Sequence, residues 1–253
     1  MINKETNIMI ICLINPNTTK IMTKTVETAA KQIASLSTEI VATNPDDGPE
    51  SIEGYYDEVF CVPGIIKEVR AHKNADAFII ACFDDTGLDA VRTITDKPVI
   101  GIGNSAFQIA SCLACSFSVI TTLDVSVPIL QTNISKYGFE RKCVNVSSVQ
   151  IPVLELENAS GECLLILENE VERTLTEDKA EAIVLGCAGM ADFAKKLEEK
   201  FKVPIIEGVS AAVVIAEGLI KMKKNTSKIG GYSYPREKLY SGTYKSFQFN
   251  KIS

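Results

Sequence analysis

The sequence contains an internal repeat, and this repeat limits the possible folds more than any other feature. The segment at 75–82, Ala-Asp-Ala-Phe-Ile-Ile-Ala-Cys, lines up with the segment at 180–187, Ala-Glu-Ala-Ile-Val-Leu-Gly-Cys. Each copy leads through a helical pattern to an apolar run that begins with proline, at 98–100 and at 204–206. The copies are 105 positions apart in a chain of 253 residues. The spacing predicts two similar units, each close to half of the chain.

Short apolar runs rich in β-branched residues alternate with longer helical patterns, which is typical of βαβ units and a mainly parallel sheet. The strands are expected at 7–14, 39–43, 77–81, 98–102, 117–121, 144–149, 182–186 and 204–206. The helices are expected at 18–36, 55–72, 86–95, 105–115, 125–137, 162–178, 190–201 and 209–223. Eight strands and eight helices are also compatible with a TIM barrel, so this count alone does not decide the fold.

The repeat favours two lobes over eight equivalent units. The same shift places the first strand and its turn, 13–15, near 119–122. We therefore predict an α/β protein with two lobes related by a pseudo-twofold axis, each a four-stranded, mainly parallel sheet flanked by helices. Lobe 1 is expected to comprise 1–104 together with 210–253, and lobe 2 to comprise 105–209. Ligands of open parallel sheets bind at the carboxyl ends of the strands, which predicts an active site in the cleft between the lobes.

Composition and charge exclude several functions. The chain has 26 basic and 32 acidic side chains and a net charge of -6, which gives no reason to expect nucleic acid or an anionic membrane as partner. No apolar run approaches the roughly 20 residues that span a bilayer, and the start of the chain lacks the pattern of a signal peptide. These features predict a cytoplasmic protein. The single histidine, His72, lies in a polar stretch at an expected helix end and is interpreted as a surface residue, which argues against a Ser-His-Asp triad or a two-histidine metal site.

The chain has eight cysteines, and a chain of this length without a secretion signal is expected to keep them as free thiols. Most are expected to be inert core residues. Cys112 and Cys115 form a lone C-x-x-C, for which a redox or zinc site is one interpretation. Because neither a second pair nor a suitable histidine completes such a site, we favour a helix end packed into the core.

Cys82 and Cys187 end the two repeat strands, each just before an expected helix. A helix amino terminus carries partial positive charge and free N–H groups, which lower the pKa of a thiol and stabilise an adjacent anion. Two thiols on opposite walls of one cleft suit racemisation: one thiolate removes a proton from a carbon, and the other thiol returns a proton to the opposite face. The competing interpretation is two buried structural cysteines that the repeat duplicated.

Four segments also resemble hallmark motifs of a known family, the Asp/Glu/hydantoin racemase superfamily, and most closely its hydantoin and allantoin racemase branch. They are Ile-Asn-Pro-Asn-Thr-Thr at 14–19, Gly-Pro-Glu-Ser-Ile-Glu-Gly at 48–54, Cys-Phe-Asp-Asp-Thr-Gly-Leu-Asp-Ala at 82–90 and Leu-Gly-Cys-Ala-Gly-Met at 185–190. The likeness extends to the tail at 231–236 and so covers nearly the whole chain. It implies a two-lobed α/β fold and catalysis without cofactor or metal.

Residue by residue, the resemblance assigns the two catalytic positions to Cys82 and Cys187. It also implies a set of positions that bind the substrate: Asn15, Ser51, Phe83, Thr121, Thr122, Ala188 and Gly189. Phe83, Ala188 and Gly189 are expected to offer N–H groups to substrate carbonyls. Asn15 and Ser51 are equally compatible with a turn residue and a helix cap.

The chain departs from the family at Asp84 and Thr86, where glycine and proline are usual. A carboxylate close to a sulfur raises the pKa of the thiol and lowers the thiolate population. We expect Asp84 and Asp85 to point to a helix start or to solvent, where a helix end favours negative charge. If Asp84 faces the cleft instead, it bears on substrate preference.

The substrate is expected to be a small molecule, and we favour a 5-substituted hydantoin or allantoin over aspartate or glutamate. None of the four motifs contains arginine, and the only lysine nearby is Lys20, so the pocket suits a neutral hydrogen-bonding ring better than a dicarboxylate. Decarboxylases and cis-trans isomerases also fit the cleft but often keep one cysteine, and a cysteine hydrolase would lack its histidine. A non-catalytic protein that binds a small ligand fits the fold equally well. Homo-oligomers are common among similar enzymes, but the sequence carries no interface signature.

Overall fold

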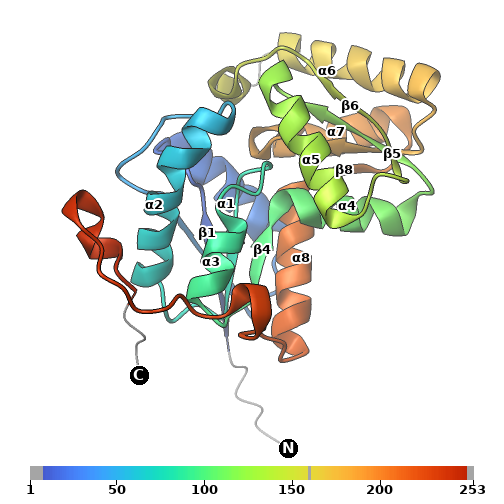
Figure 1. Ribbon diagram of the computed structural model, residues 1–253. Coiled ribbons are helices and arrows are strands. Elements are labelled where there is room, and N and C mark those ends of the chain that lie inside the picture. Colours follow the sequence, from blue (N-terminus) through green and yellow to red (C-terminus); the bar gives the residue numbers. More distant parts are fainter. Residues whose placement is uncertain (1–7, 159–160, 250–253) are drawn as a thin grey trace, which may run out of the picture.

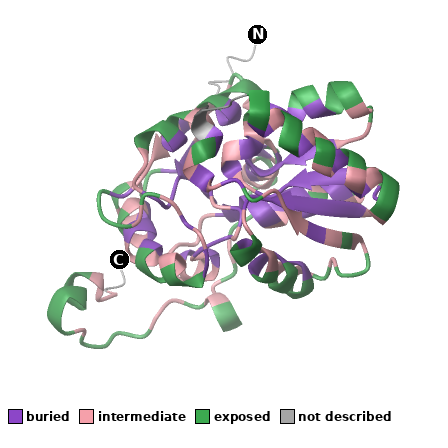
Figure 2. Ribbon diagram, turned by 90° about the horizontal axis from the view of Figure 1, so that it is seen from above, coloured by how far each residue is buried: buried purple, intermediate pink, exposed green. Residues whose placement is uncertain are grey.

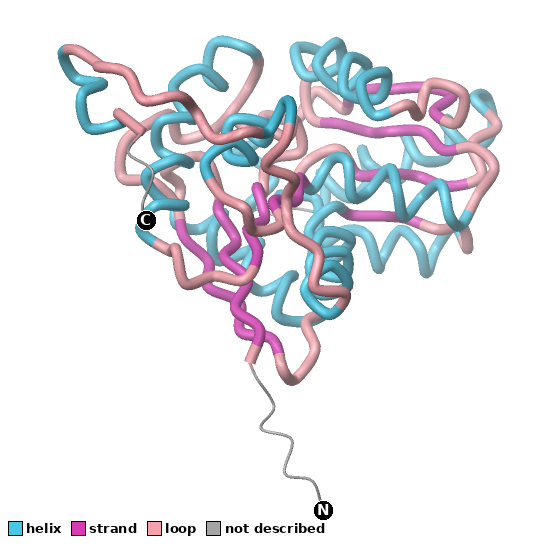
Figure 3. Tube along the Cα trace, turned by 60° about the horizontal axis from the view of Figure 1, so that its bottom comes forward, coloured by secondary structure: helices cyan, strands magenta, loops and turns pink. Residues whose placement is uncertain are grey.

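The computed structural model describes residues 8–158 and 161–249, and in them the chain forms two four-stranded sheets (Figure 1). The first sheet comprises β1 (Met9–Ile14), β2 (Thr38–Thr43), β3 (Ala77–Ile80) and β4 (Val99–Gly101). The second comprises β5 (Phe117–Thr121), β6 (Cys143–Ser148), β7 (Ala182–Leu185) and β8 (Ile205–Glu207). Figure 3 shows the strands as two separate groups with different directions.

The two sheets have the same topology. Their strand orders are β2-β1-β3-β4 and β6-β5-β7-β8, and every pair is parallel. The α/β fold with two four-stranded sheets, predicted from the repeat, is therefore confirmed. The central strands β3 and β7 are buried along their whole length, which explains their uninterrupted apolar sequences. Because all strands of a sheet are parallel, their carboxyl ends lie at one edge, where Cys82 and Cys187 follow β3 and β7.

Eight α-helices within the described residues connect and cover the strands. They are α1 (Lys20–Ile33), α2 (Tyr55–Ala71), α3 (Leu88–Ile94), α4 (Ile102–Leu113), α5 (Val127–Tyr137), α6 (Gly161–Arg173), α7 (Ala191–Phe201) and α8 (Gly208–Lys221). Seen from above in Figure 2, the central strands are buried and the outer faces of the helices are exposed. None of the helices within the described ranges is both long enough and apolar enough to span a bilayer.

Alternate residues of a strand serve different cores, as the two-residue period of a strand requires. In β3, Phe78 and Ile80 belong to a cluster under α2 and α3, whereas Ala77 and Ile79 face the other way. The cluster that contains Ala77 and Ile79 also includes residues of β5 and β7 and joins the two sheets. A third cluster lies between the outer face of β7 and helices α6 and α7.

The helices α4 and α8 exchange sides between the sheets. Helix α4 follows β4 of the first sheet but packs on β7 and β8, whereas α8 follows β8 and packs on β1, β3 and β4. The starts of the two helices cross closely, since a Cβ on Gly208 would lie 2.6 Å from the Ile102 carbonyl oxygen. Only glycine allows this approach without a shift of the backbone.

After α8 the chain returns to the first sheet. The Thr226 N–H donates to the Asp96 carbonyl, and Arg92 lies over the Tyr232 ring. The Arg70 guanidinium donates to the carbonyls of Ser246 and Phe247. This path supports a division of the chain into 1–104 with 210–253 and 105–209, which stays a proposal. Residues 1–7 and 250–253 of the first lobe and 159–160 of the second lie outside the described residues, as does position 7 of the first predicted strand.

Most element boundaries agree with the sequence prediction to within two or three residues. The helix predicted at 86–95 begins only at Leu88, because Asp85 and Gly87 have φ of 54° and 73° and cannot continue a right-handed helix. The helix predicted at 162–178 corresponds to two elements. The α-helix α6 ends at Arg173, and a single π-helical turn follows it to Asp178.

The end of α4 corrects one prediction. Cys112 and Cys115 lie at a helix end, as expected, but both are exposed rather than packed into the core. Helix α4 begins earlier than predicted and ends at Leu113, so these cysteines lie beyond the part of the helix that packs on the second sheet.

Candidate active site

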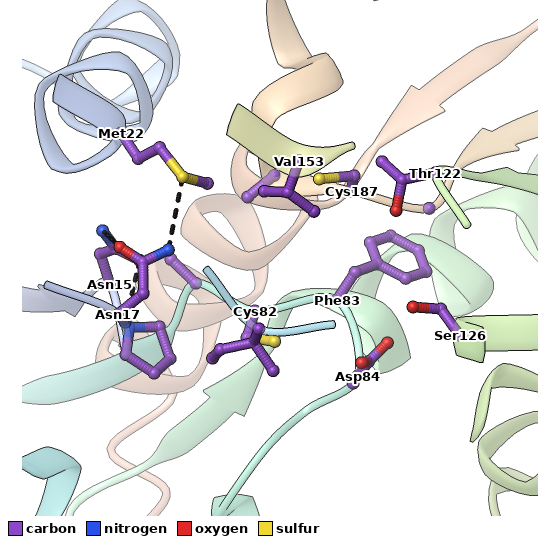
Figure 4. A pocket seen from close by; sticks show the side chains of 15 residues that line it. Asn15, Asn17, Met22, Cys82, Phe83, Asp84, Thr122, Ser126, Val153 and Cys187 are labelled. Atoms are coloured by element: carbon purple, nitrogen blue, oxygen red, sulfur yellow. Dashed lines mark hydrogen bonds between the residues drawn. The ribbon is translucent and has the colours of Figure 1, made fainter. Parts of the chain in front are cut away.

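A pocket lies between the two sheets where the carboxyl ends of β1, β3, β5 and β7 meet. It encloses about 400 Å³ of empty space, including its mouth, and both Cys82 and Cys187 line it. Figure 4 shows the two sulfur atoms at this pocket, on chain segments that come from different sheets. The structure therefore brings the cysteines of the two repeats together at one cavity, and both thiols are half-buried.

The repeat also holds in the backbone that positions the sulfurs. The Ala81 N–H donates to the Ile14 carbonyl at 2.8 Å, and the Gly186 N–H donates to the Ile120 carbonyl at 2.7 Å. In each lobe this bond extends the pairing of two strands by one residue and ends just before the cysteine. Packing at β7 is tight, since a Cβ on Gly186 would lie 3.0 Å from the Thr121 side chain.

Each sulfur has local hydrogen-bond partners. The Cys82 sulfur lies 3.4 Å from the Thr86 hydroxyl and accepts the Asp84 N–H. Cys187 lies at the start of a short 3₁₀ turn, Ala188–Met190, that runs into α7, and the backbone N–H groups of Gly189 and, to a lesser extent, Met190 act to lower its pKa. Hydrogen bonds of this kind favour the thiolate.

Burial nevertheless raises the pKa of both thiols. The pKa of Cys82 lies well above 9, because burial and then the charge of Asp84 oppose ionisation. The pKa of Cys187 rises to about 12, mainly through burial, although the Gly189 N–H acts in the opposite direction. The expectation that helix starts lower both pKa values is therefore wrong. A turn separates Cys82 from α3, and at Cys187 desolvation outweighs the two N–H donors.

Asp84 does not point to a helix start or to bulk solvent, as the sequence led us to expect. Its side chain lines the pocket, and Figure 4 shows its carboxyl group on the same side of the pocket as Ser126. Burial, the nearby Glu58 and then Asp85 raise its pKa to about 8. The reversal of the chain at Asp85, with its positive φ, turns the two neighbouring carboxylates in different directions.

Asp85 does face a helix start, that of α4. Its carboxylate accepts the N–H groups of Gly103 at 3.0 Å and Asn104 at 2.9 Å, and the Tyr137 hydroxyl at 2.8 Å. A helix N-terminus has free N–H groups that suit a carboxylate. Burial raises the pKa of Asp85 to about 6 despite these bonds.

Helix α5 of the second lobe holds the Cys82 loop of the first. Besides the Tyr137–Asp85 bond, the Asn133 side chain donates to the Asp84 carbonyl at 2.8 Å, and Lys136 pairs with Asp89 at 2.5 Å. The position of the Cys82 loop thus depends on both lobes.

Among the predicted substrate-binding residues, Asn15, Phe83, Thr122 and Ala188 line the pocket. The Asn15 amide also donates to Asn17 and Thr23, as expected for a residue that shapes a turn. Thr121 lies behind the wall, where its hydroxyl donates to the Gly186 carbonyl at 3.0 Å. The role of each of these residues in binding stays a prediction.

Two other predicted substrate-binding residues, Gly189 and Ser51, are not among the residues that line the pocket. Gly189 lies next to the Cys187 sulfur, to which its N–H is directed. Ser51 is half-buried and is not among the residues that line the pocket, although the adjacent Ile52 is. The assignment of Ser51 to substrate binding also stays a prediction.

Sequence reasoning missed several lining residues, among them Asn17, Met22, Ser126 and Val153. Met22 lies one turn into α1, and Val153 lies in the connection from β6 to α6, as the lining residue Ile52 lies in the connection from β2 to α2. Ser126 could have been found, since it lies between β5 and α5 as Asn17 lies between β1 and α1. Within the described ranges, no three His, Cys, Asp or Glu side chains are grouped as metal ligands.

Comparisons with known proteins agree with the architecture. A family model described as Asp/Glu/Hydantoin racemase matches residues 11–216. Hydantoin racemase from Pseudomonas sp. (strain NS671) is 45% identical over 97% of this chain and 99% of its own length, and hydantoin racemase from Rhizobium meliloti is 46% identical over 92% and 98%. The structure of allantoin racemase from Klebsiella pneumoniae matches with a TM-score of 0.92 and 39% identity, over 95% of this chain and 99% of that one.

Proposed function

Because the chain belongs to the Asp/Glu/hydantoin racemase family and is thus an isomerase of the racemase type, we propose that it racemises 5-substituted hydantoins or allantoin with Cys82 and Cys187 as its two bases. The observation that carries the proposal is the meeting of both repeat cysteines at one pocket. The reaction needs no group outside this chain, since each sulfur can hold and release one proton.

In the proposed mechanism one sulfur is a thiolate and the other a thiol. The thiolate takes the proton from the ring carbon that carries the substituent, and the electron pair of the broken C–H bond moves into the adjacent carbonyl to give an enolate. The thiol then delivers its proton to the opposite face of the same carbon. The two sulfurs have exchanged protonation states at the end, so one proton must return before the same direction is repeated.

The raised thiol pKa values have two opposing effects on such a reaction. They keep the thiolate fraction small at neutral pH, but they make each thiolate a stronger base. A carbon acid next to a carbonyl needs a strong base, and a half-buried thiolate supplies one. The N–H donors on Cys187 and the Thr86 hydroxyl on Cys82 retain part of the thiolate population.

The enolate oxygen needs hydrogen-bond donors at the carboxyl ends of β3 and β7. The Phe83 and Ala188 N–H groups follow the two cysteines, and among the described residues no backbone carbonyl accepts either of them. Loss of one such donor typically costs about 3 to 4 kcal/mol of transition-state stabilisation. We assign these two amides to the substrate carbonyls.

The charge of the pocket supports a neutral ring over aspartate or glutamate. Of the described residues that line it, none is lysine or arginine, and Asp84 is the one with an ionisable carboxyl group. An amino-acid substrate would bring a carboxylate into this pocket without a cation to pair with it. A hydantoin or allantoin brings amide N–H and carbonyl groups instead.

The test is circular dichroism of single enantiomers of allantoin and of 5-methylhydantoin, with the wild type, Cys82→Ser and Cys187→Ser. We expect the wild type to racemise at least one of them and both variants to lose more than about a thousandfold in rate, because each serine removes one of two essential proton carriers. Each variant should still exchange the ring hydrogen of one enantiomer in deuterated water. Near-normal racemisation by either variant contradicts the two-base assignment.

A further inference from the structure

The Asp84 carboxyl group faces the pocket without a partner in the protein. Among the described residues no hydrogen-bond donor contacts its carboxyl oxygens, and no cation pairs with it. The Asp84 main chain is nevertheless held, because the Asn133 side chain donates to its carbonyl. The next residue, Asp85, is the opposite case, since its carboxylate accepts three hydrogen bonds from α4 and α5. Asp84 is thus a fixed residue with a free polar group directed into the cavity.

We propose that the Asp84 side chain contacts the substrate and makes the pocket selective for neutral rings with adjacent amide C=O and N–H groups, against substrates that carry a carboxylate. This inference rests on the proposed function, because it names the group that selects the substrate at the same site. It also gives a role to a residue that the sequence marks as a departure from the family pattern.

The acid form of a carboxyl group fits a ring amide well. It has one O–H donor and one carbonyl acceptor, and a cis amide in a five-membered ring presents C=O and N–H on one edge. The two groups can therefore form a pair of hydrogen bonds. An ionised carboxylate has no donor and keeps only half of this pair.

The groups around Asp84 keep it in the acid form at neutral pH. Glu58 of α2 and Asp85 of the same loop carry like charge, and the thiols of Cys82 and Cys187 are neutral for most of the time. Together with burial they raise the pKa of Asp84 to about 8. The Glu58 oxygen Oε1 is itself buried without a hydrogen-bond partner among the described residues, and burial raises the pKa of Glu58 as well.

Asp84 also acts against a carboxylate substrate. A substrate carboxylate in the cleft would lie close to Glu58 and, above the pKa of Asp84, to an ionised Asp84 as well, and like charges this close cannot all ionise without cost. The cysteines would respond too, since more negative charge raises the pKa of both thiols further and lowers the thiolate population.

The experiment measures KM and kcat for racemisation of 5-methylhydantoin and allantoin from pH 7 to pH 9, and inhibition by N-carbamoylalanine, the ring-opened carboxylate of 5-methylhydantoin. The proteins are the wild type, Asp84→Ala, Asp84→Asn and a control, Glu39→Gln. Glu39 is exposed on β2, near the end of the strand opposite the pocket, so its variant replaces one carboxyl group with an amide without an effect on the site.

At pH 7 we expect Asp84→Ala to raise KM about tenfold or more, the effect of losing one to two hydrogen bonds. Asp84→Asn should recover most of this affinity, because an amide also has one donor and one acceptor face. From pH 7 to pH 9 the wild-type KM should rise as Asp84 ionises, whereas the KM of Asp84→Asn should stay level. At pH 9, where Asp84 of the wild type is ionised, N-carbamoylalanine should inhibit Asp84→Asn at least about fivefold more strongly than the wild type, and Glu39→Gln should match the wild type throughout.

An Asp84→Ala protein that is folded by circular dichroism and has the wild-type KM at both pH values overturns the inference and leaves the proposed function in place. So does an Asp84→Asn protein whose KM rises with pH like that of the wild type. If the wild type racemises neither hydantoins nor allantoin, the proposed function fails, and the inference fails with it. The wild-type measurement alone distinguishes the two failures.

Discussion

The segments after Cys82 and Cys187 start with the same geometry and then diverge within three residues. In each, the residue three positions on donates its N–H to the cysteine carbonyl, Asp85 to Cys82 at 3.0 Å and Met190 to Cys187 at 3.1 Å. Met190 has right-handed φ and ψ, so α7 begins at once, whereas Asp85 has φ of 54° and delays α3 until Leu88. The duplicated unit thus keeps the position of the sulfur and varies the loop behind it.

The divergence gives the two sulfurs different surroundings. Cys187 lies at the start of a turn whose Gly189 N–H favours its thiolate, and residues 188–190 of this turn include no carboxylate. Cys82 is followed by two aspartates, of which one lines the pocket and the other anchors the loop to the second lobe. We infer that one half of the site supplies a generic proton carrier and the other supplies selectivity as well.

Among substitutions in the loop after Cys82, the largest loss of stability is expected from Asp85→Ala. The substitution leaves the N–H groups of Gly103 and Asn104 and the Tyr137 hydroxyl without their acceptor in a buried region. Each unpaired buried group costs about 1 to 3 kcal/mol, and we expect a total loss of about 3 kcal/mol after relaxation. Urea denaturation measures it, with Asp46→Ala, an exposed aspartate in the loop after β2, as control. Equal stability of the two variants contradicts an anchoring role for Asp85.

The second prediction concerns Asp84 and pH. Its pKa rises from the usual 3.8 to about 8 on folding, so between these values the folded protein binds more protons than the unfolded chain, and stability falls as pH rises. Asp84→Asn removes this loss. The free energy of unfolding of the variant should equal that of the wild type near pH 4 and exceed it by about 2 kcal/mol at pH 8. This is less than the full pKa shift implies, because water enters the pocket.

Thermal unfolding at pH 4, 6 and 8 measures this difference. For a chain of this size 1 kcal/mol corresponds to about 2 to 4 °C in Tm. A constant Tm difference between Asp84→Asn and the wild type across this range shows that Asp84 does not titrate with a raised pKa.

A smaller effect is expected from Tyr137→Phe. It removes one of three hydrogen bonds to Asp85 and keeps the ring that contacts Phe107. We expect a loss of about 1 kcal/mol in stability and a lower kcat, because the Cys82 loop is held less firmly by α5. Tyr244→Phe, at an exposed tyrosine of the C-terminal segment, is the matched control. A stability loss without any change in kcat limits the α5 contact to a structural role.

The pairing of the two cysteines could be predicted from the sequence because the repeat fixes the strands, and parallel strands bring their carboxyl ends to one edge. The direction of Asp84 could not, because it depends on one backbone angle at Asp85 that neither composition nor periodicity records. The contact of Asp85 with α4 does have a sequence signal, the Gly-Ile-Gly at 101–103. A Cβ on Gly101 would lie 2.2 Å from the Asp85 Oδ1, and one on Gly103 would lie 2.3 Å from the Phe83 carbonyl oxygen, so these glycines make room for the Cys82 loop.

The smallest expected effect is a difference between Cys82 and Cys187 in the rate at which their thiols are alkylated. The charge of Asp84 is the second largest cause that raises the pKa of Cys82, whereas at Cys187 it ranks behind the Gly189 N–H, which lowers the pKa. Iodoacetamide reacts with thiolates, so at pH 8.5 Cys187 should be alkylated a few-fold faster than Cys82. Asp84→Asn should accelerate the alkylation of both cysteines. It should also bring the two alkylation rates closer together, because the charge of Asp84 raises the pKa of Cys82 more than that of Cys187.

Mass spectrometry of peptides after short exposure to the reagent gives both rates in one sample. Cys112 and Cys115 are exposed and would consume the reagent first, so the measurement uses a Cys112→Ser, Cys115→Ser background, in which the thiols at the pocket are unchanged. Faster labelling of Cys82 than of Cys187 would mean that the Thr86 hydroxyl and the Asp84 N–H outweigh the carboxylate. In that case the loop with the two aspartates, rather than the turn before α7, would hold the more readily ionised sulfur.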